Sequence, residues 1–196
     1  DLVGKTVGVI GTGKIGQVFS ELMMGFGCKV IAYDLYPNDA LKEKGVEYKD
    51  LQKLFEQSDI ISLHCPLTPA THQIINKTSL KWMKKGAMLI NTSRGKLVNT
   101  PDVIESLRNK HLGYLGIDVY AEEEKLFFRD LSERIIDDEM IIQLMTFPNV
   151  LITAHQAFLT HEALTEIAHT TLDNIKAITE NGSSDNEVNI ELIQSS

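Results

Sequence analysis

Residues 6–16 read Thr-Val-Gly-Val-Ile-Gly-Thr-Gly-Lys-Ile-Gly, and this stretch decides the fold. Its first half, Thr6–Ile10, is a short run of β-branched and apolar residues that predicts a buried strand. Gly11, Gly13 and Gly16 follow at once in a GxGxxG pattern that opens a helix. Such glycines permit a tight turn, and the helix N-terminus offers unpaired N–H groups to a pyrophosphate. We therefore predict a dinucleotide-binding unit, with an unliganded glycine-rich turn as the alternative.

Apolar strands alternate with amphipathic, helix-length segments along the rest of the chain. Further strands are predicted at Lys29–Tyr33, Ile60–His64, Ala87–Asn91, Tyr114–Asp118 and Val150–Thr153, with a short extra strand at Val46–Tyr48. Most of these runs are apolar on both faces, as a parallel sheet covered by helices on each side requires. The pattern predicts an α/β fold, a doubly wound parallel sheet of the Rossmann type.

Helix ends and domain limits follow from capping residues. Gly27 is expected to end the first helix, and Thr100 followed by Pro101 predicts an N-cap with proline at the first helical position. The last helix is expected to run from about Thr160 to Asn181-Gly182. We predict one domain over residues 1–182 and a C-terminal tail over 183–196. A long excursion at 120–148 is expected to be functional or to cover an interface.

Composition excludes several classes of protein. The chain has 196 residues, 43% of them hydrophobic, and a formal net charge of −8 without a long basic run, which argues against nucleic-acid or anionic-membrane partners. No apolar stretch approaches the roughly 20 residues that cross a bilayer, and no export signal opens the chain. Cys28 and Cys65 lack CxxC spacing and a nearby Cys/His set, so neither a disulfide nor a metal site is expected. A cytoplasmic protein with a small-molecule partner is predicted.

Asp34 ends the second predicted strand and comes 18 residues after Gly16 (34 − 16). This is close to the spacing at which an acidic residue accepts the ribose hydroxyls of a bound dinucleotide. A carboxylate there repels a 2′-phosphate, and the following Leu35, Tyr36 and Pro37 offer no cation for one. We predict NAD(H) rather than NADP(H). A methyl-donor cofactor, which also uses a glycine-rich loop and an acid, is the alternative.

Arg94, Glu123 and His155 each follow a different predicted strand. Parallel strands end at one edge of the sheet, so all three are expected to gather where the dinucleotide binds. A guanidinium holds a substrate carboxylate, imidazole transfers protons near neutral pH, and a carboxylate stabilises imidazolium. The set suggests reduction of a 2-oxo acid. Singly, each residue has a structural explanation, and Glu122 and Glu124 compete with Glu123 for its role.

The chain resembles the D-2-hydroxyacid dehydrogenase family, and within it the bacterial D-lactate dehydrogenase branch. The matching stretches are Val7-Gly-Val-Ile-Gly-Thr-Gly-Lys-Ile-Gly16, Ser62-Leu-His-Cys-Pro-Leu-Thr68, Ile90-Asn-Thr-Ser-Arg-Gly95, Gly116-Ile-Asp-Val-Tyr120, Leu126-Phe-Phe128 and Phe147-Pro-Asn-Val-Leu-Ile-Thr-Ala-His-Gln-Ala-Phe158. The resemblance implies that Arg94, Glu123 and His155 are catalytic. It also implies contacts to NAD from Lys14, Ile15, Asp34, Cys65, Pro66, Thr71, Thr92, Ser93, Arg94 and Asp118, beside the glycines.

The same resemblance implies a wider architecture. Family members carry a substrate domain built mainly from an N-terminal segment of roughly one hundred residues, which this chain lacks, so we expect little turnover from it alone. Homodimers through the cofactor domain are implied, with the 120–148 excursion and Phe127-Phe128 as a candidate contact. Two alternatives are a dehydrogenase for a larger 2-oxo acid and a non-catalytic NAD(H)-sensing corepressor that binds peptides.

Overall fold

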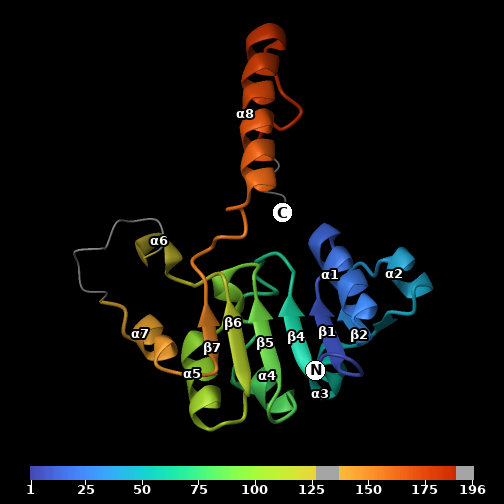
Figure 1. Cartoon of the computed structure of the whole chain (residues 1–196), viewed down its shortest axis with the longest axis vertical. Helices are drawn as coiled ribbons and strands as arrows, with labels where there is room; N and C mark the ends of the chain where they lie inside the picture. Colours follow the sequence, from blue (N-terminus) through green and yellow to red (C-terminus); the bar gives the residue numbers. More distant parts are fainter. Residues whose placement is uncertain (127–136, 189–196) are drawn as a thin grey trace. The chain divides into compact units, whose positions relative to one another are not determined.

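The computed structural model describes residues 1–126 and 137–188 (Figure 1). Two compact units divide the chain, residues 1–155 and residues 156–196. The domain limit at residue 182 therefore stays a prediction. Phe127 and Phe128, the candidate dimer contact, lie outside the described residues.

A seven-stranded parallel sheet forms the first unit. Its strands are β1 (Thr6–Ile10), β2 (Lys29–Tyr33), β3 (Glu47–Tyr48), β4 (Ile60–Leu63), β5 (Met88–Asn91), β6 (Tyr114–Ile117) and β7 (Val150–Ile152). They lie in the order β3-β2-β1-β4-β5-β6-β7 with every neighbouring pair parallel, and the arrowheads of β4, β5, β6 and β7 point to one edge in Figure 1. The predicted doubly wound α/β fold is confirmed. The strand bounds differ from the predicted ones by at most one residue at either end. The order reverses between β1 and β4, which is where such sheets bind ligands.

Two apolar cores cover the two faces of the sheet, because successive strand residues point to opposite sides. On one face, Val7 and Val9 of β1 pack with Phe19 of the first helix. On the other face, Ile10 of β1 packs in the cluster that contains Phe55 of the third helix. All of these strand residues are at most 1% exposed. The sheet is therefore a rigid platform for side chains at its carboxyl edge.

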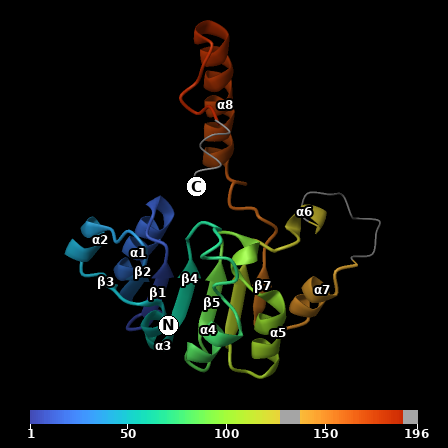
Figure 2. The ribbon, with the colours of Figure 1, turned by 180° about the vertical axis from the view of Figure 1, so that it is seen from behind.

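Helices connect the strands, as the two opposite views show (Figures 1 and 2). In the first unit they are α1 (Lys14–Gly25), α2 (Asp39–Glu43), α3 (Leu51–Gln57), α4 (Lys77–Trp82), α5 (Thr100–Arg108), α6 (Glu123–Leu126) and α7 (Glu139–Met145), with a 3₁₀ turn at Gly95–Leu97. Gly27 follows α1 with a φ of 76°, as expected of a residue that ends a helix. The predicted N-cap at Thr100 is wrong. Asn99 caps α5 instead, because its side chain accepts a hydrogen bond from Asp102 N at 3.1 Å.

The second unit consists mainly of α8 (His161–Asn181), with the predicted limits. The Thr160 side chain caps it by accepting from Ala163 N at 3.1 Å, and Gly182 ends it in a left-handed conformation. Beyond the helix, Ser184 Oγ donates to Asn174 Oδ1 at 2.7 Å. Across both units, no helix in the described part of the chain has the length and apolar character of a membrane span.

Candidate active site

The turn between β1 and α1 is built from glycines for two different reasons. Gly11 has a φ of 94°, and a Cβ there would lie 2.5 Å from the backbone N of Cys65. A Cβ at Gly16 would lie 2.0 Å from the carbonyl oxygen of Gly11. A Cβ at Gly13 would meet nothing within 4 Å, and Gly13 caps α1 without a side chain. Backbone packing thus requires the outer glycines, while Gly13 leaves open space at a helix N-terminus where a pyrophosphate fits.

Asp34 lies at the carboxyl end of β2, beside this turn. Its Oδ2 accepts hydrogen bonds from Thr12 N at 2.6 Å and Thr12 Oγ1 at 3.0 Å, and its Oδ1 accepts from Tyr36 N at 2.9 Å. Tyr48 of β3 donates its hydroxyl to Thr12 Oγ1 at 2.9 Å. The carboxylate is therefore fixed next to the glycine turn, where it suits an adenosine ribose.

The loop after β4 forms the other wall of the glycine turn. Ser93 Oγ donates to the carbonyl oxygen of Cys65 at 2.7 Å, which ties this loop to the loop after β5. Thr71 Oγ1 donates to the carbonyl oxygen of Pro66 at 2.7 Å. Burial raises the pKa of the Cys65 thiol to about 11, so the thiol stays protonated and is a poor nucleophile. Cys65 and Pro66 contribute mainly their backbone to this edge.

His64 lies beside the glycine turn and packs against α1. Its ring lies 4.8 Å from the Phe19 ring of α1, centroid to centroid, and its Nε2 is 2.9 Å from Ser62 Oγ. Burial lowers the pKa of His64 to about 4, so the imidazole is neutral at pH 7. The ring acts as a packed, uncharged spacer between β4 and α1.

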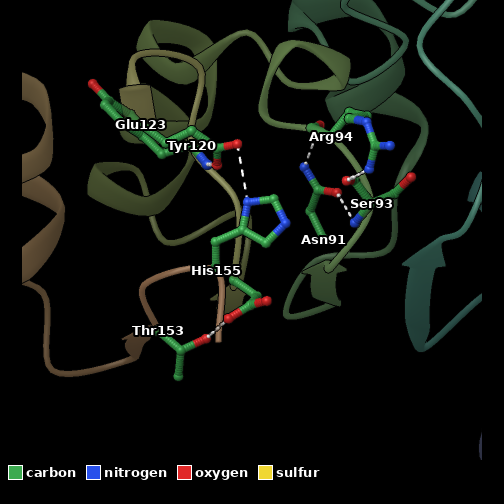
Figure 3. A network of polar contacts seen from close by, with 8 residues as sticks. Asn91, Ser93, Arg94, Tyr120, Glu123, Thr153 and His155 are labelled. Atoms are coloured by element: carbon green, nitrogen blue, oxygen red, sulfur yellow. Dashed lines mark hydrogen bonds and ion pairs between the residues drawn. The ribbon is translucent and has the colours of Figure 1, made fainter. Parts of the chain in front are cut away.

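Arg94 is presented by a short loop that Asn91 organises (Figure 3). Asn91, 1% exposed at the end of β5, accepts from Ser93 N at 3.1 Å and donates to the carbonyl oxygen of Arg94 at 2.9 Å. The Arg94 guanidinium donates to the carbonyl oxygen of Ser93 at 2.8 Å and remains exposed, as does Thr92. The loop therefore fixes the backbone while leaving the cationic group accessible to a ligand.

His155 and Glu123 meet at the same edge of the sheet, although Glu123 follows β6 and His155 follows β7 (Figure 3). His155 Nδ1 lies 3.1 Å from Glu123 Oε1, and the other carboxylate oxygen accepts from Tyr120 N at 2.9 Å. The backbone of His155 adopts a φ of 51° and donates its N–H to the carbonyl oxygen of Asp118 at 2.7 Å. The structure thus places Glu123, one residue of the acidic run, against the imidazole.

Asp118 lies between the sheet and His155. It is 7% exposed, and its carboxylate accepts a hydrogen bond from the Thr153 hydroxyl. Sequence reasoning missed Thr153, Asn91 and Tyr120 as site residues, which bond to Asp118, to the Arg94 backbone and to Glu123 respectively. Their common signal is a polar group at or just beyond the end of an apolar strand.

A cavity of about 220 Å³ opens beside these residues. Arg94 and Glu123 both line it, so a cation and the carboxylate that contacts His155 face one space. Leu67, Gly95, Lys96, Tyr120, Ala121 and Glu122 complete the lining. The space is therefore lined by two cationic side chains, Arg94 and Lys96, and by two carboxylates, Glu122 and Glu123. Within residues 1–126 and 137–188, no group of three or more His, Cys, Asp or Glu side chains is placed to hold a metal ion.

A glycine turn that fits a pyrophosphate and a His–Glu pair on one edge of a parallel sheet define a dinucleotide-binding domain of the doubly wound class. The family follows from residues 1–157, which match the "D-isomer specific 2-hydroxyacid dehydrogenase, NAD binding domain". The chain belongs to this family, and the predictions of an NAD cofactor and of the family are confirmed.

Known proteins agree with this assignment. The chain is 53% identical to 2-hydroxyacid dehydrogenase A of Aspergillus oryzae, covering 89% of the chain and 50% of that protein. It is 49% identical to the D-lactate dehydrogenase of Escherichia coli, covering 95% and 57%. A solved structure of Aquifex aeolicus D-lactate dehydrogenase, complexed with NAD and lactic acid, matches with a TM-score of 0.84 and 35% identity, covering 94% and 58%. The chain spans about half the length of the relatives it matches.

Proposed function

We propose that the chain is the cofactor-binding and catalytic part of an NAD-dependent D-2-hydroxyacid dehydrogenase that converts pyruvate and NADH to D-lactate and NAD. The observation that carries the proposal is the 3.1 Å contact between His155 Nδ1 and Glu123 Oε1 at the edge that also holds the glycine turn. NADH, when bound, supplies the hydride. The residues of the chain supply the proton, the orientation and the charge.

His155 is the proton donor in this proposal. Charge develops on the keto oxygen as the keto carbon becomes tetrahedral, and an imidazolium donates its proton to that oxygen. The Glu123 carboxylate lies at Nδ1, where it orients the ring and stabilises its charged form, and the proposal assigns the proton transfer to Nε2. In the reverse direction, neutral His155 accepts the hydroxyl proton of the 2-hydroxy acid.

Arg94 holds the substrate. Its guanidinium is exposed and lines the cavity that Glu123 also lines. A guanidinium binds a carboxylate through two parallel hydrogen bonds, which fixes the plane of a 2-oxo acid and polarises the adjacent carbonyl. Arg94 and His155 thus act on the two ends of the same small molecule.

The cofactor is held at the carboxyl edge of the sheet by the β1–α1 turn and the end of β2. The turn at Gly11, Gly13 and Gly16 and the N-terminus of α1 receive the pyrophosphate, while Asp34 accepts the ribose hydroxyls. The remaining proposed contacts are Lys14, Ile15, Cys65, Pro66, Thr71, Thr92, Ser93, Arg94 and Asp118.

The names of the relatives support a small substrate, since they include D-lactate dehydrogenases of several organisms. A longer 2-oxo acid is the alternative within the same chemistry. We also propose a cytoplasmic homodimer formed through this domain. Val18, Leu22 and Phe26 of the α1 region support a contact between copies, because they are more than half exposed. The chain on its own is expected to turn over little, since Arg94 faces open solvent.

NADH oxidation across a panel of 2-oxo acids tests the proposal, with the full protein that contains this chain and with the handedness of the product determined. Preference for pyruvate and formation of D-lactate would support it. Preference for a longer oxo acid would revise the proposed substrate and leave the proposed chemistry unchanged. NADH binding without turnover of any oxo acid would contradict the enzymatic role and favour an NAD(H)-sensing module.

A further inference from the structure

Tyr120 is a buried residue whose hydroxyl group forms hydrogen bonds. The residue is 3% exposed, and its hydroxyl donates to both carboxylate oxygens of Asp138, at 2.9 and 3.0 Å. Burial and the neighbouring Asp138 carboxylate raise the pKa of Tyr120 above its ordinary value. The hydroxyl therefore remains a hydrogen-bond donor over the whole pH range in which the site works.

Asp138 is itself anchored to the core. Its Oδ1 accepts from Met140 N and Ile141 N, each at 3.0 Å, so the residue caps α7. Ile141 and Leu144 of α7 are 3% and 1% exposed, which fixes this helix against the apolar interior. The carboxylate that receives the Tyr120 hydroxyl is thus attached to a packed element rather than to a free surface side chain.

The backbone of Tyr120 contacts Glu123 directly (Figure 3). Tyr120 N donates to Glu123 Oε2 at 2.9 Å, and Glu123 N donates to the carbonyl oxygen of Tyr120 at 3.2 Å. On its other side, a Cβ at Gly95 would lie 2.1 Å from the carbonyl carbon of Tyr120, so the loop that carries Arg94 packs against the same peptide. The direction of the Glu123 carboxylate therefore depends on where the Tyr120 backbone lies.

We propose that Tyr120 is a positioning residue, which Asp138 anchors through the tyrosine hydroxyl so that Glu123 Oε1 faces His155 Nδ1. The inference rests on the proposed function for its effect on turnover, but its structural part concerns the imidazole alone. A carboxylate held at Nδ1 selects the tautomer of the neutral ring in which Nδ1 carries the proton. A carboxylate released from its backbone donor populates several directions and selects this tautomer less strongly.

Two substitutions separate positioning from packing. Tyr120→Phe keeps the buried ring and removes the hydroxyl. Asp138→Ser keeps a side chain that caps α7 but is too short to reach Tyr120 in the same way. Tyr114→Phe is the matched control, because Tyr114 is 54% exposed on β6 and its hydroxyl is in none of the hydrogen bonds among the described residues.

The first readout is the ¹⁵N chemical shifts of the His155 ring in the 196-residue chain at a pH where the imidazole is neutral. We expect the Nδ1–H tautomer to dominate in the parent and in Tyr114→Phe, and to lose population in Tyr120→Phe and Asp138→Ser. The second readout is turnover in the full protein, where both variants should lower kcat about tenfold with little change in the affinity for NADH. The double variant should be no worse than either single one.

An unchanged tautomer in Tyr120→Phe would overturn the proposal even if kcat falls, because the loss would then come from packing. A parent-like Asp138→Ser beside an impaired Tyr120→Phe would overturn the role of the anchor. A protein without activity on any oxo acid would contradict the proposed function, and the tautomer measurement would still decide the positioning role.

Discussion

His155 Nδ1 lies 3.1 Å from Glu123 Oε1, although 32 residues separate the two in the sequence. The contact exists because β6 and β7 are neighbours in the sheet and both end at the same edge. The His155 N–H is bonded to the carbonyl oxygen of Asp118, which directly follows β6. The sheet itself therefore sets the position of the imidazole.

Replacing His155 by Gln removes the proton donor while keeping a polar side chain of similar size. We expect kcat for oxo-acid reduction to fall on the order of a hundredfold to ten-thousandfold, with a modest change in NADH affinity. Steady-state kinetics of the full protein and fluorescence titration with NADH measure the two effects. The matched control is His169→Gln, since His169 is exposed on α8. A near-normal rate in the His155 variant would remove this residue from the acid role.

Alanine substitutions at two glycines of the β1–α1 turn should affect different properties, stability at Gly11 and NADH binding at Gly13. Gly11→Ala should lower the free energy of unfolding by at least about 2 kcal/mol, because the residue has a φ of 94° and its Cβ would clash with Cys65 N. Gly13→Ala should change stability by less than about 1 kcal/mol but weaken NADH binding by about tenfold or more, since its methyl group enters the open space. Urea unfolding and NADH titration check the pair. Tight NADH binding by Gly13→Ala would place the pyrophosphate elsewhere.

Asp34→Ala should narrow the preference for NADH over NADPH, because the carboxylate that repels a 2′-phosphate is gone. The expected change is about tenfold in the ratio of the two dissociation constants. Asp39→Ala is the control, since Asp39 is an exposed residue of α2 that forms an ion pair with Lys42. If the ratio were the same in the parent and in Asp34→Ala, Asp34 would not select the cofactor.

His64 should make the domain less stable in acid. Burial lowers the pKa of the folded residue to about 4 from an ordinary value of 6.5, so the unfolded chain takes up this proton first as the pH falls. The contribution of neutral His64 to the free energy of unfolding is complete above pH 6.5 and is lost as the pH falls from 6.5 to 4. Its size is roughly 3 kcal/mol.

Urea unfolding at pH 7 and pH 4.5 tests this for the parent and for His64→Gln. The parent should lose more stability than the variant on acidification, because only the parent carries the shifted histidine. His72→Gln, at an exposed position, should lose as much as the parent. Equal losses in the parent and in His64→Gln would show that His64 titrates normally in the folded state.

The fold and the position of the candidate site at the sheet edge could be predicted because parallel sheets impose strong rules on sequence. Strand residues such as Val9 and Ile10 must be apolar on both faces, which gives uninterrupted apolar runs. Polar residues after such runs lie at one edge, so the order of the residues along the chain was enough to place positions 34, 94 and 155 there. The hydrogen bonds of Asp34, of the Arg94 loop and of His155 put all three at that edge.

The supporting contacts could not be predicted, because they depend on local chain reversals rather than on periodicity. Spacing alone did not show which of Glu122, Glu123 and Glu124 contacts His155. In the structure, Tyr120 N donates to Glu123 Oε2, and the other carboxylate oxygen of Glu123 faces the imidazole. The bond from Tyr120 to Asp138 joins residues that are 18 positions apart in the chain. The cap of α5 is Asn99 rather than Thr100 for a similar reason, since the reach of one side chain decides it.

The pH dependence of catalysis in both directions tests the central claim most directly, with the full protein and its His155→Gln variant measured side by side. Oxo-acid reduction needs protonated His155 and should decline as the pH rises, whereas hydroxy-acid oxidation needs the neutral ring and should decline as the pH falls. Both declines should disappear from the residual activity of the variant. Parallel pH profiles in the two directions, or opposing profiles that persist in the variant, would contradict the role of the His155–Glu123 pair.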